Sequence, residues 1–239
     1  KMKDFDGTEI NGMGPIIDED AMDALYKKLE TLTEGDTLVL AGSIPSSMPK
    51  SIYSDILKAL NGRGIHFVVD ATKELLLNVL PYGPFLIKPN NHELGEIFDV
   101  VLKTKDEVVP YAKRLQEMGA RNVLVSMAGE GAVLVDEKGA VHKLDAPKGT
   151  LINAVGAGDS MVAGFIAGWE EKKNYVYAFQ MAVAAGSASA FSELLATREE
   201  IEKAKKNYKR KIDFDSEIKT YSNGTDYPLC SKTSFNLDE

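Results

Sequence analysis

Short apolar runs that alternate with segments of helical spacing constrain the fold of this chain more than any other feature. Runs of mainly apolar residues occupy positions 37–41, 65–69, 85–87 and 122–126. A strand that is apolar at consecutive positions is buried on both faces, as in a parallel sheet covered by helices. Between the first two runs, the apolar residues of Ser51–Leu60 fall on one helical face. The sequence therefore predicts an α/β protein, a three-layer sandwich with a mostly parallel sheet and helices on both faces.

Further helices and one hairpin complete the expected order. Helices are expected at Lys73–Leu80, His92–Phe98, Asp106–Met118, Gly156–Trp169 and Tyr175–Phe191, and the two strands of a hairpin at Gly131–Asp136 and Ala140–Leu144. Thr197 with Glu200 three positions later has the pattern of a capping box, which predicts the start of a last helix. From about Asn207 the chain is polar and turn-rich, which favours a disordered or loosely packed tail over an added hairpin.

Composition excludes several classes of partner. The net charge of −8 and a pI near 5.1 argue against nucleic acid, because wrapping it normally requires a basic face. No apolar run has the ~18 residues that a membrane-spanning helix needs. Cys230 is the single cysteine, so no intrachain disulfide forms, which suits a cytoplasmic protein. The three histidines are scattered and lack the spacing of a zinc site.

The strongest chemical signal is the turn Gly156-Ala157-Gly158-Asp159, which opens directly into an expected helix. Glycines let the backbone bend sharply and approach a ligand, and the free N–H groups of a first helical turn favour an anion. A carboxylate beside an anion site suits a base that takes a proton from an attacking hydroxyl during phosphoryl transfer. The alternative is that Asp159 is a helix-start acid that complements the helix dipole. The turn matches neither the Walker pattern nor the dinucleotide fingerprint.

Four further sequence motifs are informative when they are taken together with this turn. They are Thr8–Asn11 followed by Gly14-Pro15, Gly42-Ser43-Ile44-Pro45, Lys88-Pro89-Asn90-Asn91-His92-Glu93-Leu94 and Ala185–Glu193. Together with the glycine-acid turn they resemble the ribokinase, or PfkB, family of carbohydrate kinases, from about Thr8 to Glu202, and within it the 1-phosphofructokinase branch. The resemblance implies a ribokinase-like fold, an anion hole at Gly156, Ala157 and Gly158, and Asp159 as the catalytic base.

The resemblance also implies roles in binding magnesium and phosphate. Asn90 and Glu93 would order Mg²⁺ and the phosphates of ATP, and Lys88 would contact phosphate. A carboxylate and an amide near phosphates suit an ion that keeps several of its waters. The alternatives are a plain helix cap for Asn90 and Glu93, and an exposed strand-end lysine for Lys88. Asp70 ends a strand where open α/β sheets bind ligands, or is a loop acid.

The remaining expected nucleotide contacts come from small residues. By resemblance, Ser126, Gly129 and Gly131 would lie beside the phosphates and ribose of ATP, and their alternative is a tight β-turn between two strands. Ala185, Gly186 and Ser189 would wall the adenine pocket, and their alternative is close helix packing. The family tends to have glycine after the Ser-Glu pair, where this chain has Leu194.

The resemblance implies a kinase that acts on a phosphorylated sugar, with a homodimer left open. Fructose 1-phosphate is the first candidate substrate and tagatose 6-phosphate the second. The family's upstream sugar site and most of its lid strands have no counterpart here. The chain is therefore expected to be N-terminally incomplete, with a lid remnant at 1–15, a nucleotide-binding core at 16–206 and a polar tail at 207–239. A nucleotide-binding remnant without catalysis is the main alternative, and a dinucleotide oxidoreductase is a distant one.

Overall fold

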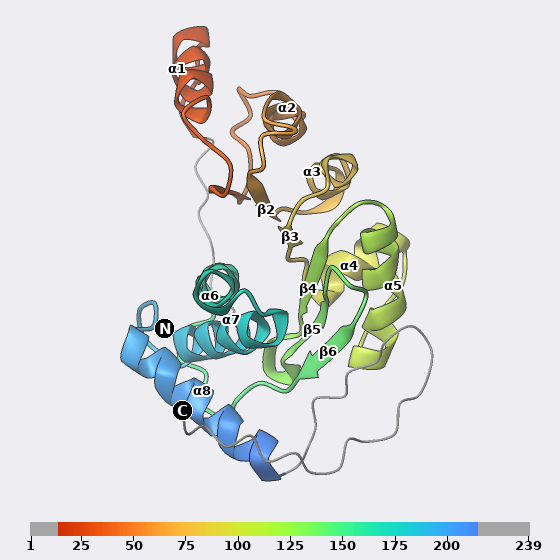
Figure 1. The fold of residues 1–239 in the computed structure, drawn as a ribbon, viewed down its shortest axis with the longest axis vertical. Helices are drawn as coiled ribbons and strands as arrows, with labels where there is room; N and C mark the ends of the chain where they lie inside the picture. The colour runs from red at the N-terminus through yellow and green to blue at the C-terminus, as the bar shows by residue number, and fades with distance from the viewer. Residues whose placement is uncertain (1–13, 215–239) are drawn as a thin grey trace, which may run out of the picture.

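The computed structural model describes the backbone of residues 14–214 and the side chains of residues 14–206. Within them, six strands form one sheet in sequential order (Figure 1). The first four strands are parallel, and the last three form an antiparallel meander, in agreement with the predicted hairpin. The strands are β1 (Thr37–Ala41), β2 (His66–Asp70), β3 (Leu86–Ile87), β4 (Asn122–Ser126), β5 (Ala132–Val135) and β6 (Val141–Leu144).

Helices cover both faces of the sheet, as predicted (Figure 1). One face carries α2 (Ile52–Ala59), α3 (Lys73–Leu77), α4 (Asn91–Phe98) and α5 (Lys105–Glu117). The other face carries α6 (Ala157–Lys172) and α7 (Tyr175–Ala190), and α8 (Arg198–Phe214) packs on α7 through Ala184, Ala188 and Ala204. The short helices η1 (Leu80–Tyr82) and η2 (Ala128–Glu130) lie in connections.

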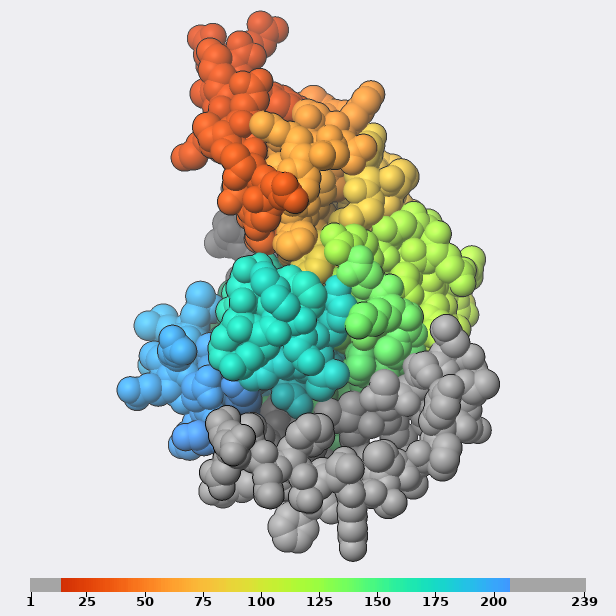
Figure 2. All heavy atoms as spheres, viewed as in Figure 1, coloured from red at the N-terminus to blue at the C-terminus, as the bar shows by residue number. Residues whose placement is uncertain are grey.

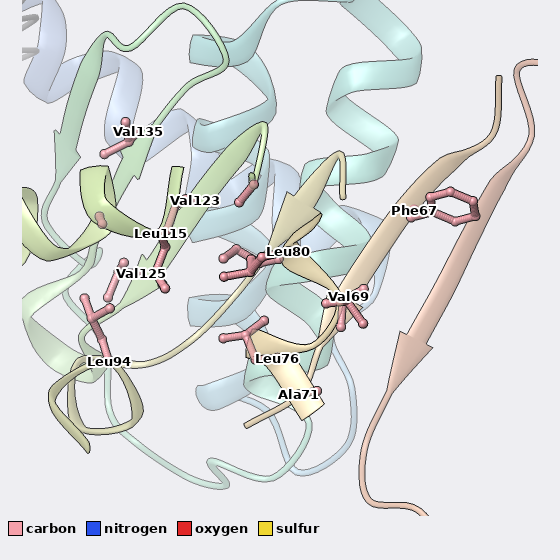
Figure 3. Close-up of a cluster of buried hydrophobic side chains, with 14 of the residues drawn as sticks. Phe67, Val69, Ala71, Leu76, Leu80, Leu94, Leu115, Val123, Val125 and Val135 are labelled. Atoms are coloured by element: carbon pink, nitrogen blue, oxygen red, sulfur yellow. The ribbon is translucent and has the colours of Figure 1, made fainter. Parts of the chain in front are cut away.

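The core is divided between the two faces by the alternation of side chains along each strand. Val69 of β2 belongs to the larger apolar cluster with Leu76 and Leu80, and these side chains point toward one another in Figure 3. Its neighbour Val68 belongs to the second cluster, with Phe165 of α6. Full burial of each such side chain stabilises the fold by about 1.5–3 kcal/mol. Burial on both faces explains why these strands lack polar residues at alternate positions.

Strand β1 departs from this pattern. Val39 is 44% exposed, and Leu38 and Leu40 are only half-buried, although the run was expected to be covered on both faces. The physical reason is that the apolar cluster beneath α6 and α7 contains no residue of β1. Helix α1 (Glu19–Leu29), whose Leu29 belongs to the larger apolar cluster, lies far from α8 in the space-filling view (Figure 2).

The sequence interpretation omitted α1, although its signals are present. The Asp18 side chain accepts a hydrogen bond from the Ala21 N–H at 2.9 Å, and acids follow in the first turn. The expected helix at 73–80 is wrong in its last turn, because α3 ends at Leu77. Pro81, the second residue of η1, has a ring that disfavours helical backbone before it.

Helix α8 continues to Phe214, past Asn207, where the predicted polar tail begins. The remainder of the tail and nearly all of the proposed lid remnant lie outside the described residues. Among the residues that the structure describes, no helix is long and apolar enough to cross a membrane.

Candidate active site

The carboxyl ends of three adjacent parallel strands bring several of the predicted site residues together. Asp70 ends β2, Lys88 follows β3, and Ser126 ends β4. Asn90 forms an isolated parallel bridge with Ser126, whose N–H donates to the Pro89 carbonyl at 3.1 Å. The carboxyl ends of parallel strands are where open α/β sheets bind ligands. The lysine-asparagine box and the end of β4 therefore share one edge of the sheet.

Lys88 and Asp70 form a buried ion pair at this edge. The Lys88 Nζ lies 3.2 Å from the Asp70 Oδ2, and the two side chains are only 8% and 18% exposed. The interpretation of Lys88 as an exposed strand-end lysine is therefore wrong. Burial raises the pKa of Asp70, Lys88 lowers it, and Asp159 and Glu93 raise it, with a net increase. The carboxylates of Asp159 and Glu93 are therefore near enough to disfavour the charged form of Asp70.

The glycine-acid turn lies beside this ion pair. Gly156 is the N-cap of α6, has a φ of 77° and provides no capping side chain. The N–H of Ala157 donates to the Ala154 carbonyl at 3.2 Å, and that of Ser160 to the Gly156 carbonyl at 2.9 Å. Gly158 and Asp159 lie between Ala157 and Ser160. They are too close to the start of the helix for their N–H groups to reach a helical carbonyl one turn back. These two groups are available to an anion.

Gly158 connects the turn to the ion pair. A Cβ atom built on Gly158 would lie 3.1 Å from the Lys88 Nζ, so the ammonium group lies against the first turn of α6. Asp159, the next residue, is exposed. The positive end of the helix and the ammonium group both favour phosphate at this point, and the exposed carboxylate remains accessible to a second reactant.

Asn90 and Glu93 form a capping box, which was the alternative role predicted for them. The Asn90 Oδ1 accepts from the N–H groups of His92 at 2.9 Å and Glu93 at 2.8 Å, and the Glu93 Oε2 accepts from the Asn90 N–H at 2.8 Å. The part of the chain that the structure describes contains no group of three or more metal-ligating side chains. Glu93 offers the single carboxylate that a largely hydrated Mg²⁺ requires, so the residues fit an ion held mainly by water and phosphate.

The two glycines after β4 differ in what requires them. Gly131 has a φ of 90°, and an added Cβ would lie 2.0 Å from the Leu144 carbonyl oxygen, so the turn itself requires glycine. Gly129 is exposed, and no atom lies within 4 Å of the place where its Cβ would be. The alternative role, a tight turn, therefore accounts for Gly131, whereas no contact in the structure requires glycine at 129, and its contact with nucleotide stays a prediction.

The small residues of α7 contact α6. Ala185 and Ser189 are each 2% exposed. A Cβ built on Gly164 of α6 would lie 2.7 Å from the Ala185 Cβ, and one on Gly186 would lie 3.0 Å from the Ala157 carbonyl oxygen. Close helix packing, the alternative reading for these residues, is therefore present, and their contact with adenine stays a prediction.

The sequence interpretation left Asp70 undecided and did not consider Tyr53. The Tyr53 hydroxyl donates to the Ala41 carbonyl at 2.8 Å, and burial raises the pKa of Tyr53, with a further increase from Asp70. An acid and a lysine at the ends of adjacent apolar strands, 70 and 88, were the available signal for the ion pair. No comparable signal indicates Tyr53, because its place depends on how α2 packs against β1.

Comparison with known proteins agrees with this geometry. The sequence profile described as "pfkB family carbohydrate kinase" matches residues 3–201. The 1-phosphofructokinase of Bacillus subtilis is 48% identical over 199 residues, which are 83% of this chain and 65% of that protein. The D-tagatose-1-phosphate kinase of Bacillus licheniformis is 32% identical over 186 residues, which are 77% of this chain and 61% of that protein.

Solved structures give the same result. Phosphofructokinase-2 from Escherichia coli, in complex with substrates and products, superposes with a TM-score of 0.73 at 29% identity, covering 79% of this chain and 62% of that one. The chain thus spans about 65% of the length of the Bacillus subtilis relative. The profile covers most of the sequence, and the sheet with helices on both faces agrees with the solved structures. The chain belongs to the pfkB family of carbohydrate kinases and has the ribokinase-like α/β fold.

Proposed function

We propose that this chain transfers the γ-phosphoryl group of ATP to a hydroxyl of a phosphorylated hexose, with fructose 1-phosphate as the first candidate. The supporting observation is the first turn of α6, where an exposed carboxylate, Asp159, stands next to two N–H groups without helical partners. Lys88 lies against the same turn. A base beside an anion site is the arrangement that phosphoryl transfer to an alcohol requires.

The chemistry follows from these positions. Asp159 accepts the proton of the sugar hydroxyl as its oxygen forms a bond to the γ-phosphorus, and the bond between that phosphorus and the bridging oxygen of ADP breaks. The segment Gly156, Ala157 and Gly158 is proposed as the anion hole. The N–H of Gly158, with that of Asp159, is free to face the charge on the transferring group, whereas the N–H of Ala157 already donates to the Ala154 carbonyl at 3.2 Å. Lys88, fixed by Asp70, adds a positive charge beside Gly158.

Asn90 and Glu93 are proposed to organise magnesium at the start of α4. When bound, the ion would neutralise phosphate charge during transfer. Glu93 uses its Oε2 in the capping box, which fixes the side chain at the edge of the sheet near Asp70. Ser126, Gly129 and Gly131 are proposed to line the nucleotide phosphates and ribose. Ser126 supports this proposal, because it ends β4 at the same edge of the sheet as Asn90.

The substrate proposal rests on the names of the relatives. One is named for the 1-phosphate of fructose and another for that of tagatose. Tagatose 1-phosphate therefore replaces tagatose 6-phosphate as the second candidate substrate. A cytoplasmic location and a homodimer belong to the same proposal, and one related structure is described as a tetrameric form.

Two measurements on the whole chain test the function. Calorimetry would report ATP binding with and without Mg²⁺, and a coupled assay of ADP release would report turnover with fructose 1-phosphate and with tagatose 1-phosphate. We expect ATP binding and faster turnover with fructose 1-phosphate. Binding without turnover would favour the non-catalytic remnant, and binding of NAD(P) in place of ATP would contradict the kinase proposal.

A further inference from the structure

The start of α6 has no side-chain cap, so contacts from elsewhere must fix its first turn. Helix α7 supplies these contacts. A Cβ built on Gly186 would lie 3.0 Å from the Ala157 carbonyl oxygen, and the Ser189 Oγ donates to the Ser160 Oγ at 2.8 Å. Gly186 and Ser189 are three positions apart and therefore share one face of α7.

Ser189 also joins this turn to the loop that follows α7. Its Oγ accepts a hydrogen bond from the Ala196 N–H at 3.1 Å while its own proton goes to Ser160. Ser189 is 2% exposed, so water cannot readily replace its hydroxyl as the hydrogen-bond partner of Ser160 or of Ala196. The residue before Ala196, Leu195, lies against the turn itself, since a Cβ on Gly156 would be 2.7 Å from the Leu195 Cδ2.

We infer that Ser189 is a positioning residue, which holds the catalytic turn of α6 in register with Leu195 and Ala196 through its two hydrogen bonds. This inference rests on the proposed function. Ser160 directly follows Asp159, so a shift of the Ser160 hydroxyl moves the base and the adjacent N–H groups together. A displacement of about 1 Å at a reacting group costs up to about a hundredfold in rate. Partial loosening of one contact should therefore cost about tenfold.

The first experiment compares Ser189→Ala, Ser160→Ala and the double variant with the wild-type chain. For Ser189→Ala we expect kcat to fall about tenfold, with the KM for the phosphosugar within about twofold. The double variant should lose little more than the worse single variant, because both substitutions remove the same hydrogen bond. A double variant whose fold loss of kcat equals the product of the two single losses would overturn the inference.

Ser192→Ala is the matched control. In the wild-type chain, the Ser192 Oγ donates to the Ala188 carbonyl at 3.0 Å and to Glu200 at 3.3 Å. The substitution therefore removes a serine hydroxyl at the same end of α7 that has no hydrogen bond to α6. We expect its kcat within about twofold of wild type. An equal loss of kcat in Ser192→Ala and Ser189→Ala would show general damage to the end of α7 and would overturn the inference.

Hydrogen exchange separates the positioning role from the proposed function. Peptides covering residues 156–162 should exchange faster in Ser189→Ala and Ser160→Ala than in Ser192→Ala, whether or not the chain turns over. Faster exchange supports the positioning role, and unchanged exchange overturns it. The kinase proposal would instead be refuted by a wild-type chain that neither binds ATP nor turns over a phosphosugar. The exchange rates are independent of that result.

Discussion

Replacement of Lys88 by methionine tests the ion pair on which the candidate site is built. Two charges 3.2 Å apart attract by about 5 kcal/mol at an effective dielectric constant of about 20. Desolvation offsets much of this attraction, but removal of one partner leaves the other charge buried and typically costs about 3–5 kcal/mol. Since Asp70 is only 18% exposed, we expect Lys88→Met to lower the free energy of unfolding by an amount in that range.

The loss should depend on pH with a sign that follows from Asp70. Burial raises the pKa of Asp70, and Lys88 opposes that increase. Removal of the ammonium group should therefore raise the pKa of Asp70 further. A carboxyl with a raised folded-state pKa contributes stability that is present below its unfolded pKa and lost as pH rises through its folded pKa. Lys88→Met should therefore be least destabilised in acid and most destabilised toward neutral pH.

Urea denaturation of Lys88→Met and of the double variant Asp70→Asn/Lys88→Met, between about pH 5 and pH 8, provides the measurement. The double variant removes both charges and should recover at least about half of the loss at neutral pH, with a flatter pH profile. A single variant within about 1 kcal/mol of wild type would refute the buried pair. A double variant as unstable as the single one would also refute it.

Three further outcomes follow from the structure. Gly131→Ala should lower the free energy of unfolding by about 2 kcal/mol or more, because of its positive φ and the nearby backbone, whereas thermal melting of Gly129→Ala should match wild type. Burial raises the pKa of Asp136, but hydrogen bonds from His142 and two N–H groups outweigh burial, so the pKa in the folded state is lowered. Wild type should therefore lose stability as pH falls through this lowered pKa, and Asp136→Asn should lack that stability at neutral pH. Acid titration of unfolding would measure the difference. Thr197→Ala removes an N-cap hydroxyl and should cost about 1 kcal/mol in urea denaturation.

Features encoded by neighbouring residues were predictable from the sequence. Strands such as β2 are apolar at consecutive positions because both of their faces are buried, and this leaves a visible run. Capping boxes at Asn90 and Thr197 are local patterns three positions long, and both occur in the structure. The turn at Gly156 was recognisable because two glycines and an acid stand together at the start of a helix.

Features that depend on tertiary neighbours were not predictable in the same way. The Asp70–Lys88 pair exists because β2 and β3 are adjacent, and the Ser189–Ser160 hydrogen bond exists because α7 packs on α6. The exposure of Val39 depends on which helices reach β1, which the run of apolar residues does not encode. The extension of α8 beyond Asn207 was missed because the polar composition there masks a sparse helical spacing, in which Tyr208 and Ile212 continue the row of Ile201 and Ala204.

The most direct measurement of the central claim compares Asp159→Asn with wild type in ATP affinity and in kcat. Loss of a general base should lower kcat by about 10²–10⁴-fold, while the ATP dissociation constant from calorimetry stays within about threefold. Asp99→Asn is the control, since Asp99 is an exposed residue in left-handed backbone that asparagine also adopts. An Asp159→Asn variant that kept its kcat within about twofold of wild type would contradict the proposed role of this carboxylate.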